Sequence, residues 1–116
     1  MVIGPLLYAA RTQLLPPPPP GINQCPATQN IQSTLYTDPD LPPPYGDGYQ
    51  YTATANGKTW SGQTAATHDD YLAPEYALKP EAIHERNGKL LCDYGGNRVV
   101  KNGEVANPYL RLSALK

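Results

Sequence analysis

The sequence has few of the residues that usually build a large core. It contains no phenylalanine, one tryptophan (Trp60) and one methionine, against nine tyrosines and 14 prolines. A tyrosine ring can pack while its hydroxyl stays in water. A deep core is therefore not expected, and the composition favours a thin sheet core or a tyrosine-rich surface that faces a partner.

Basic clusters and long apolar runs are missing as well. The nine basic and ten acidic residues are scattered and give a formal net charge of -1. A nucleic-acid binder needs a basic face, and so does a protein that binds an anionic membrane surface, so neither partner is expected. No run approaches the ~18 apolar residues that span a bilayer, and Met1–Leu7 lacks the basic start of a signal peptide.

Histidine is too rare to suggest a metal site. The two histidines, His68 in a loop and His84 on the outer side of a strand, have no second histidine at ligand spacing, and no CxxC occurs. No metal and no cofactor are therefore expected. The GxSxG, P-loop, HExxH and GxGxxG motifs are also missing. The sequence predicts that the protein is not an enzyme.

The two cysteines, Cys25 and Cys92, allow two interpretations. An oxidised pair would close a loop of about 68 residues and stabilise the fold by ~4 kcal/mol in the chain-entropy relation. Only about 70–80 residues remain to fold beside the proline-rich segments, and a core of that size gains much from a covalent link. A disulfide would predict an oxidising compartment. The alternative is two unrelated buried thiols in a cytosolic protein.

Residues 1–24 form an N-terminal tail, which we separate from a single β-rich domain at 25–116. Apolar residues recur at helical spacing in Val2–Leu15, and the candidate partner-binding side chains are Ile3, Leu6, Leu7 and Leu14. A helix this short is marginal alone and would need a partner, and a disordered tail is the alternative. The five prolines Pro16–Pro20 predict a polyproline II spacer of roughly 15 Å, or a ligand for an aromatic-lined groove.

Three Asn-Gly pairs predict β-hairpins, because both central residues of a type I′ turn take positive φ. The first hairpin joins Tyr49–Ala55 to Lys58–Thr64 and pairs Ala53 with Trp60. The two faces of this hairpin differ in composition: one carries mainly aromatic side chains, and the other carries threonine, serine and glutamine. The face that we predict to be in the core carries Tyr49, Tyr51, Ala53 and Trp60. If the sheet faced the other way, Trp60 would be exposed and would serve as a binding residue for a partner.

The second hairpin joins Ala82–Arg86 to Lys89–Tyr94, and the third joins Arg98–Lys101 to Glu104–Ala106. The buried face predicted for the second hairpin carries Ile83, Leu90, Cys92 and Tyr94, and Glu85 shares it near the turn. Three such turns in a small chain predict a mainly β fold. We expect a small antiparallel β-sandwich or open barrel, with the extended tail outside it.

Other segments can be assigned from their patterns. We predict a strand at Asn30–Thr37, a short helix within Tyr71–Leu78 that Pro80 stops, and a strand at the sheet edge at Pro108–Leu115. The intervening loop contains Pro42-Pro43-Pro44-Tyr45, which matches the PPxY pattern read by WW domains. A proline-rich turn that ends in a packed tyrosine is the alternative, and the one we favour.

Three short motifs follow one another along the chain: Cys25-Pro26, Trp60-Ser61-Gly62 and Leu91–Tyr94. In this order the chain resembles a family of small exported bacterial proteins of unknown function. Members have an early Cys-Pro, a central W-x-G and a late L-x-C-x-Y in one β-rich domain, and the last motif is matched approximately. The resemblance covers residues 25–112. It implies export, a Cys25–Cys92 disulfide and no known catalysis.

Two functions are compatible with these features. The first is a non-enzymatic structural or accessory subunit of a bacterial envelope assembly, such as a secretion apparatus, which docks on other protein subunits through its tail. The second is a free secreted or periplasmic binding protein of the inhibitor or immunity type, in which the tail is incidental. The expected location is the periplasm or cell envelope, or the exterior after secretion.

Overall fold

The computed structural model describes residues 21–116. This part of the chain consists of eight β-strands and three short 3-10 helices. The helices span Ile22–Gln24, Thr28–Asn30 and Pro74–Tyr76. The strands are β1 (Gln32–Thr37), β2 (Asp47–Ala55), β3 (Lys58–Gln63), β4 (Lys79–Arg86), β5 (Lys89–Gly95), β6 (Val99–Lys101), β7 (Glu104–Ala106) and β8 (Tyr109–Leu115).

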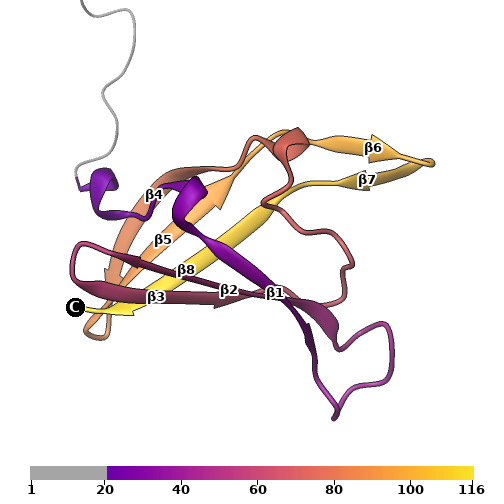
Figure 1. The fold of residues 1–116 in the computed structure, drawn as a ribbon, viewed down its shortest axis with the longest axis horizontal. Helices are drawn as coiled ribbons and strands as arrows, with labels where there is room; N and C mark the ends of the chain where they lie inside the picture. Colours follow the sequence, from indigo (N-terminus) through magenta and orange to yellow (C-terminus); the bar gives the residue numbers. More distant parts are fainter. Residues whose placement is uncertain (1–20) are drawn as a thin grey trace, which may run out of the picture.

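Six strands form one antiparallel sheet in the order β1-β2-β3-β8-β5-β4, and β6 pairs with β7 in a separate sheet. The larger sheet is not closed, and the prediction of a mainly β, hairpin-rich fold is confirmed. Figure 1 shows β1, β2 and β3 crossing the half formed by β8, β5 and β4 at an angle. The β6–β7 hairpin projects from one end of the molecule (Figure 1).

The Asn-Gly turns set the register of all three hairpins. Asn56, Asn87 and Asn102 have φ values of 53, 52 and 51°, and each is followed by a glycine with positive φ. These are the conformations that a type I′ turn requires. The predicted pair Ala53–Trp60 is confirmed, and the other two hairpins have the predicted strands, with Ile83 opposite Cys92 and Lys101 opposite Glu104. A shift of one residue in the first or second hairpin would have moved its apolar side chains to the solvent face.

The core lies on the inner face of the six-stranded sheet, beneath the segment that precedes β1. The largest fully buried side chains are Trp60, Tyr51, Tyr76, Tyr94, Leu110 and Leu112. The hydroxyl of Tyr94 donates a hydrogen bond to the carbonyl of Pro26, and Thr28 Oγ1 donates to the carbonyl of Leu78 at 2.7 Å. These two bonds fix the preceding segment over the core and give buried polar groups their partners.

The two halves of the sheet meet at Gly62. Strands β3 and β8 share one register pair, Ser61 with Ser113. A Cβ added at Gly62 would collide with the Arg111 carbonyl oxygen and the Leu112 side chain. The backbones of β3 and β8 therefore approach so closely that only glycine fits between them.

The prediction that Pro108–Leu115 is an edge strand is wrong. Strand β8 lies between β3 and β5, near the middle of the sheet. The predicted alternation is correct, since Leu110, Leu112 and Ala114 are all buried. Alternation identifies the face of a strand that is buried, but it does not show whether the strand has one neighbouring strand or two. That number depends on pairings between residues far apart in the sequence.

Two local predictions are also corrected. The expected helix within Tyr71–Leu78 is a single 3-10 turn, and Pro80 lies inside β4, an edge strand that tolerates a missing N–H. The expected packed tyrosine, Tyr45, is 63% exposed. The loop is closed by backbone bonds, such as that from the N–H of Asp38 to the carbonyl of Gly46 at 2.9 Å, so its turn does not need the tyrosine ring.

Candidate functional site

The predicted disulfide is confirmed and joins the start of the domain to the centre of the sheet. Cys25 follows the helix Ile22–Gln24, and Cys92 lies in the middle of β5 with its side chain fully buried. Their Cα atoms are 5.8 Å apart, within the usual range for a disulfide. Neither cysteine is available as a nucleophile or a metal ligand in this oxidised form.

The five predicted core residues lie on the inner face, at two depths. Tyr51 and Trp60 are completely buried, and the Trp60 indole N–H donates to the carbonyl of Ala55 at 3.3 Å. Three residues are partly buried and pack against the core from its margin: Tyr49, Ile83 and Leu90. The Tyr49 and Tyr51 rings lie 6.2 Å apart in a tilted arrangement. The alternative of an exposed Trp60 is thereby ruled out.

The four candidate partner-binding residues Ile3, Leu6, Leu7 and Leu14 lie outside the described residues. The point where the tail joins the domain is nevertheless defined. A Cβ at Gly21 would contact the Ile83 side chain at 3.8 Å, which places residue 21 against β4. Asn56 Nδ2 donates to the carbonyl of Gln24 at 3.1 Å. The tail thus begins at a fixed place beside β4 and the disulfide.

A groove runs between the β6–β7 hairpin and the segment 65–76, and we call it the hairpin groove. It consists of two cavities of about 270 and 480 Å³. Both are lined by the same four residues: Asp69, Glu104, Val105 and Ala106. The smaller cavity extends to Tyr76 and Lys101, and the larger one extends to Pro44 and His68.

Tyr76 is the unusual residue of this groove. Its side chain is 1% exposed, and its hydroxyl has no hydrogen-bond partner within residues 21–116. Its ring meets Tyr71 edge-on at 5.4 Å, and Lys101 Nζ lies 5.8 Å from the ring centre. Burial, with the nearby Asp69 carboxylate, raises the pKa of the Tyr76 hydroxyl, so the group keeps its proton and can act as a donor.

The charges of the groove favour ligands that donate hydrogen bonds. Lys101 is paired with Glu75 at 2.7 Å, which leaves the Asp69 and Glu104 carboxylates as the main charged groups of the lining. Val105 and Ala106 add a small apolar surface between them. A cationic or N–H-rich group fits this lining better than an anion does.

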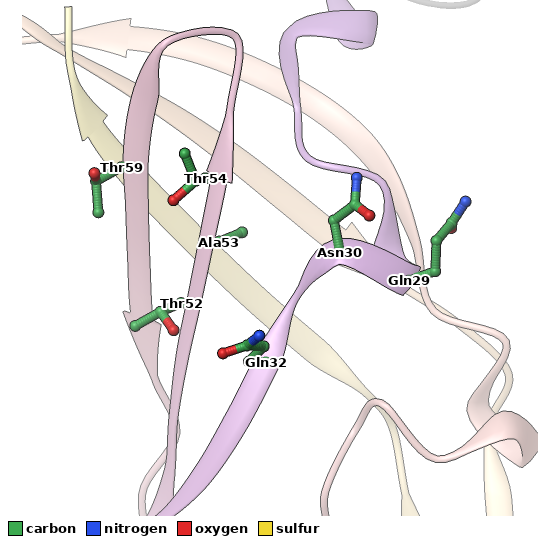
Figure 2. A pocket seen from close by; sticks show the side chains of 7 residues that line it. All are labelled: Gln29, Asn30, Gln32, Thr52, Ala53, Thr54 and Thr59. Atoms are coloured by element: carbon green, nitrogen blue, oxygen red, sulfur yellow. The ribbon is translucent and has the colours of Figure 1, made fainter.

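A shallow, uncharged hollow lies where β1 begins, between the helix Thr28–Asn30 and the strands β2 and β3. Its volume is about 690 Å³, and its lining consists of Gln29, Asn30, Gln32, Thr52, Ala53, Thr54 and Thr59. Figure 2 shows these side chains, all polar except Ala53, spread over the strands and the segment before β1 rather than converging on one point. This arrangement suits a broad, weakly selective contact surface and does not resemble a catalytic centre.

Asp93 organises a cluster on the outer face of β4, β5 and β8. It accepts hydrogen bonds from Arg111 Nε at 2.6 Å, from the Tyr109 hydroxyl at 3.1 Å and from His84 Nε2 at 3.0 Å. The Arg111 hydrogen bond is the main reason that the pKa of Asp93 is lowered. His84 was correctly placed on the outer side of its strand, but the cluster was missed. Its members come together only because β8 lies beside β5.

Within residues 21–116, no helix is long and apolar enough to cross a membrane. In the same range, no three His, Cys, Asp or Glu side chains gather closely enough to hold a metal ion. Comparison of the chain with protein-family models, curated proteins and solved structures gives no match.

Proposed function

We propose that this chain is a non-enzymatic structural or accessory subunit of a bacterial envelope assembly, such as a secretion apparatus, and that it docks on a neighbouring protein through its tail. The Cys25–Cys92 disulfide carries this proposal. Structural disulfides persist in oxidising compartments and are rare in the cytosol. They are also typical of small extracytoplasmic domains whose core alone gives marginal stability.

The attachment of the tail supports docking at a distance from the domain. Residue 21 is held against β4, so a spacer formed by Pro16–Pro20 would extend from a defined point on the domain. A polyproline II segment of this length reaches roughly 15 Å. The apolar residues of Val2–Leu15 would then meet a partner surface away from the core of the domain, and burial there would remove leucine side chains from water.

Both histidines and several of the acidic and basic residues have structural partners that account for them. His84 and Arg111 both bind the Asp93 carboxylate, and His68 Nε2 lies 3.2 Å from Asp47 Oδ2 on the surface. Asp70 accepts hydrogen bonds from Ser33 at 2.6 Å and from Tyr51 at 3.3 Å. These contacts supply the reason for a structural role rather than acid–base catalysis.

A free periplasmic or secreted binding protein is the second candidate function. The hairpin groove favours it, because this groove is a concave site on the domain itself and does not involve the tail. In that case Asp69 and Glu104 would recognise a cationic group of the bound molecule.

The test compares two triple-serine variants of the full-length protein in its native cells. In the tail variant, serine replaces Leu6, Leu7 and Leu14. In the control it replaces three exposed apolar residues of the domain, Leu41, Val100 and Leu115. The expected result is that only the tail variant fails to enter a high-molecular-weight complex on native gels, while both keep the wild-type melting temperature. A tail variant that assembles normally would overturn the proposal in favour of the free binder.

The compartment is tested by trapping thiols in intact cells. Alkylation in denaturant without reductant should leave Cys25 and Cys92 unmodified if the protein resides in the periplasm, the envelope or the exterior. Two alkylated cysteines in protein taken from its native compartment would remove the basis for export.

A further inference from the structure

The six-stranded sheet has two outer strands of very different character. Within residues 21–116, β1 and β4 each pair with one neighbour only. Strand β4 carries features that prevent further pairing: a register shift at Pro80/Ala82 and the polar or charged residues Lys79, Glu81, His84, Glu85 and Arg86. Strand β1, with the sequence QSTLYT, has no charge, no proline and no bulge. Proteins usually protect an edge of this kind.

The backbone of β1 offers three regularly spaced residues to a further strand. The N–H of Asp38 donates to the carbonyl of Gly46, which makes this a hydrogen-bonded pair in the ladder with β2. Hydrogen-bonded pairs alternate in an antiparallel ladder, so Gln32, Thr34 and Tyr36 also bond to β2. The N–H and C=O groups of Ser33, Leu35 and Thr37 consequently point away from the sheet.

The middle residue of this set is also the most exposed large apolar side chain among the described residues. Leu35 is 78% exposed, although it lies on the same face of the sheet as Tyr49 and Tyr51. No residue of β1 is buried. Strand β1 therefore combines free backbone groups with an apolar side chain that gains from being covered.

We propose that two copies of this chain pair antiparallel through β1, with a two-fold axis at Leu35, and so join their sheets into one. Leu35 would lie opposite Leu35 of the partner subunit, and Ser33 opposite Thr37 of the partner subunit. Each of these pairs exchanges two backbone hydrogen bonds. The pairing continues the existing sheet and needs no rearrangement of either copy.

The charges around β1 favour a second copy of this chain as the partner that pairs with it. Strand β1 is neutral, so two copies approach without repulsion. In this register the nearest carboxylate, Asp38, lies opposite Gln32 of the partner subunit and not opposite its own counterpart. The set Ser33, Leu35 and Thr37 is symmetric about its centre, as an isologous contact requires. The pairing does not involve the tail and is independent of the function proposed above.

The first test measures the molar mass of the full-length protein by sedimentation over a dilution series. We expect a dimer that dissociates on dilution. Leu35→Lys should be a monomer throughout, because two lysines would face each other across the axis. Leu115→Lys is the matched control, since Leu115 is 74% exposed on another strand, and it should dimerise like the wild type. A wild-type monomer at every concentration, or a dimeric Leu35→Lys variant, would overturn the proposal.

The second test resolves the register by hydrogen exchange of single amides. Thr34 N–H bonds to β2 and should exchange slowly at all concentrations. Leu35 N–H should exchange roughly tenfold or more slower in the dimer than in the monomer. Equal exchange of Leu35 N–H in both states would refute pairing through β1. Among the backbone hydrogen-bonding groups of β1, Leu35→Pro removes only the outward N–H of residue 35. It should abolish the dimer and keep the protection of Thr34; a dimeric Leu35→Pro variant refutes the pairing too.

Discussion

Reduction of the Cys25–Cys92 disulfide should cost a large part of the stability of this domain. The bridge joins residues 67 apart in the sequence and so closes a loop of about 68 residues in the unfolded chain. For a loop of that length the chain-entropy relation gives about 4.4 kcal/mol at room temperature. A chain of this size is expected to have a total stability of roughly 5–15 kcal/mol. The reduced protein should therefore be marginally folded.

The measurement is urea unfolding of the oxidised and the reduced full-length protein, monitored by Trp60 fluorescence. Two quantities should change. The midpoint should fall by the equivalent of about 4 kcal/mol, and the slope of the transition should rise, because the unfolded chain without the bridge exposes more surface. The melting temperature should fall by tens of degrees, since about 1 kcal/mol corresponds to several degrees at this size.

The control is the double variant Cys25→Ala, Cys92→Ala. It should resemble the reduced protein, somewhat destabilised by the space left at the buried Cys92 position, and it should not respond to reductant. If reduction changes the free energy of unfolding by less than about 1 kcal/mol, and the slope stays constant, the loop-closure reasoning is wrong for this domain.

Four further substitutions have defined expectations. Trp60→Ala should lower the free energy of unfolding by ~3–5 kcal/mol in urea titrations, because its ring is fully buried; a wild-type value would contradict its place in the core. Gly62→Ala should cost ~3 kcal/mol or more, because the new Cβ meets the Arg111 carbonyl; a change under about 1 kcal/mol would contradict the close crossing. Tyr76→Phe should be neutral or stabilise by about 1 kcal/mol in thermal melts, since it removes an unpartnered hydroxyl; a clear loss would reveal a partner for that group. The pKa of Asp93 is lowered in the folded protein, so its stabilising effect is present above its ordinary pKa of 3.8 and is lost as the pH falls through the lower value. Asp93→Asn should lower the free energy of unfolding at pH 7 by about 1 kcal/mol and should make it depend less on pH in the acid range. Equal pH profiles of wild type and variant would refute this.

Local features of the fold were predictable because their causes are local. The Asn-Gly turns fix positive φ at two residues, and the alternation of apolar side chains then fixes the register of each hairpin. Trp60 and Cys92 were therefore assigned to the correct face. The position of β8 was not predictable in this way, because its neighbours, β3 and β5, are distant in the sequence.

The same distinction explains what was found and missed among the candidate sites. The disulfide Cys25–Cys92 could be inferred because the chain has only two cysteines and neither lies in a metal-binding motif. The Asp93 cluster and the hairpin groove could not, since each joins segments that only the completed sheet brings together. Arg111 and Asp93 become cross-strand neighbours only when β8 lies beside β5, so the cluster had no signal in the sequence alone.

The disulfide also determines how the domain would respond to mechanical load. A pull on the tail enters at residue 21 and reaches Cys25 within a few residues, and from there it passes through the S–S bond to β5 in the sheet. Residues 26–91 lie inside the closed loop and bear no tension along this path. If the domain is stretched between its tail and its C-terminus, only the segments outside the loop can lengthen, each by at most ~3.4 Å per residue. The first hairpin, with Trp60, would carry no tension through its own backbone, but it would lose its neighbour β8 when the segment after Cys92 is extended.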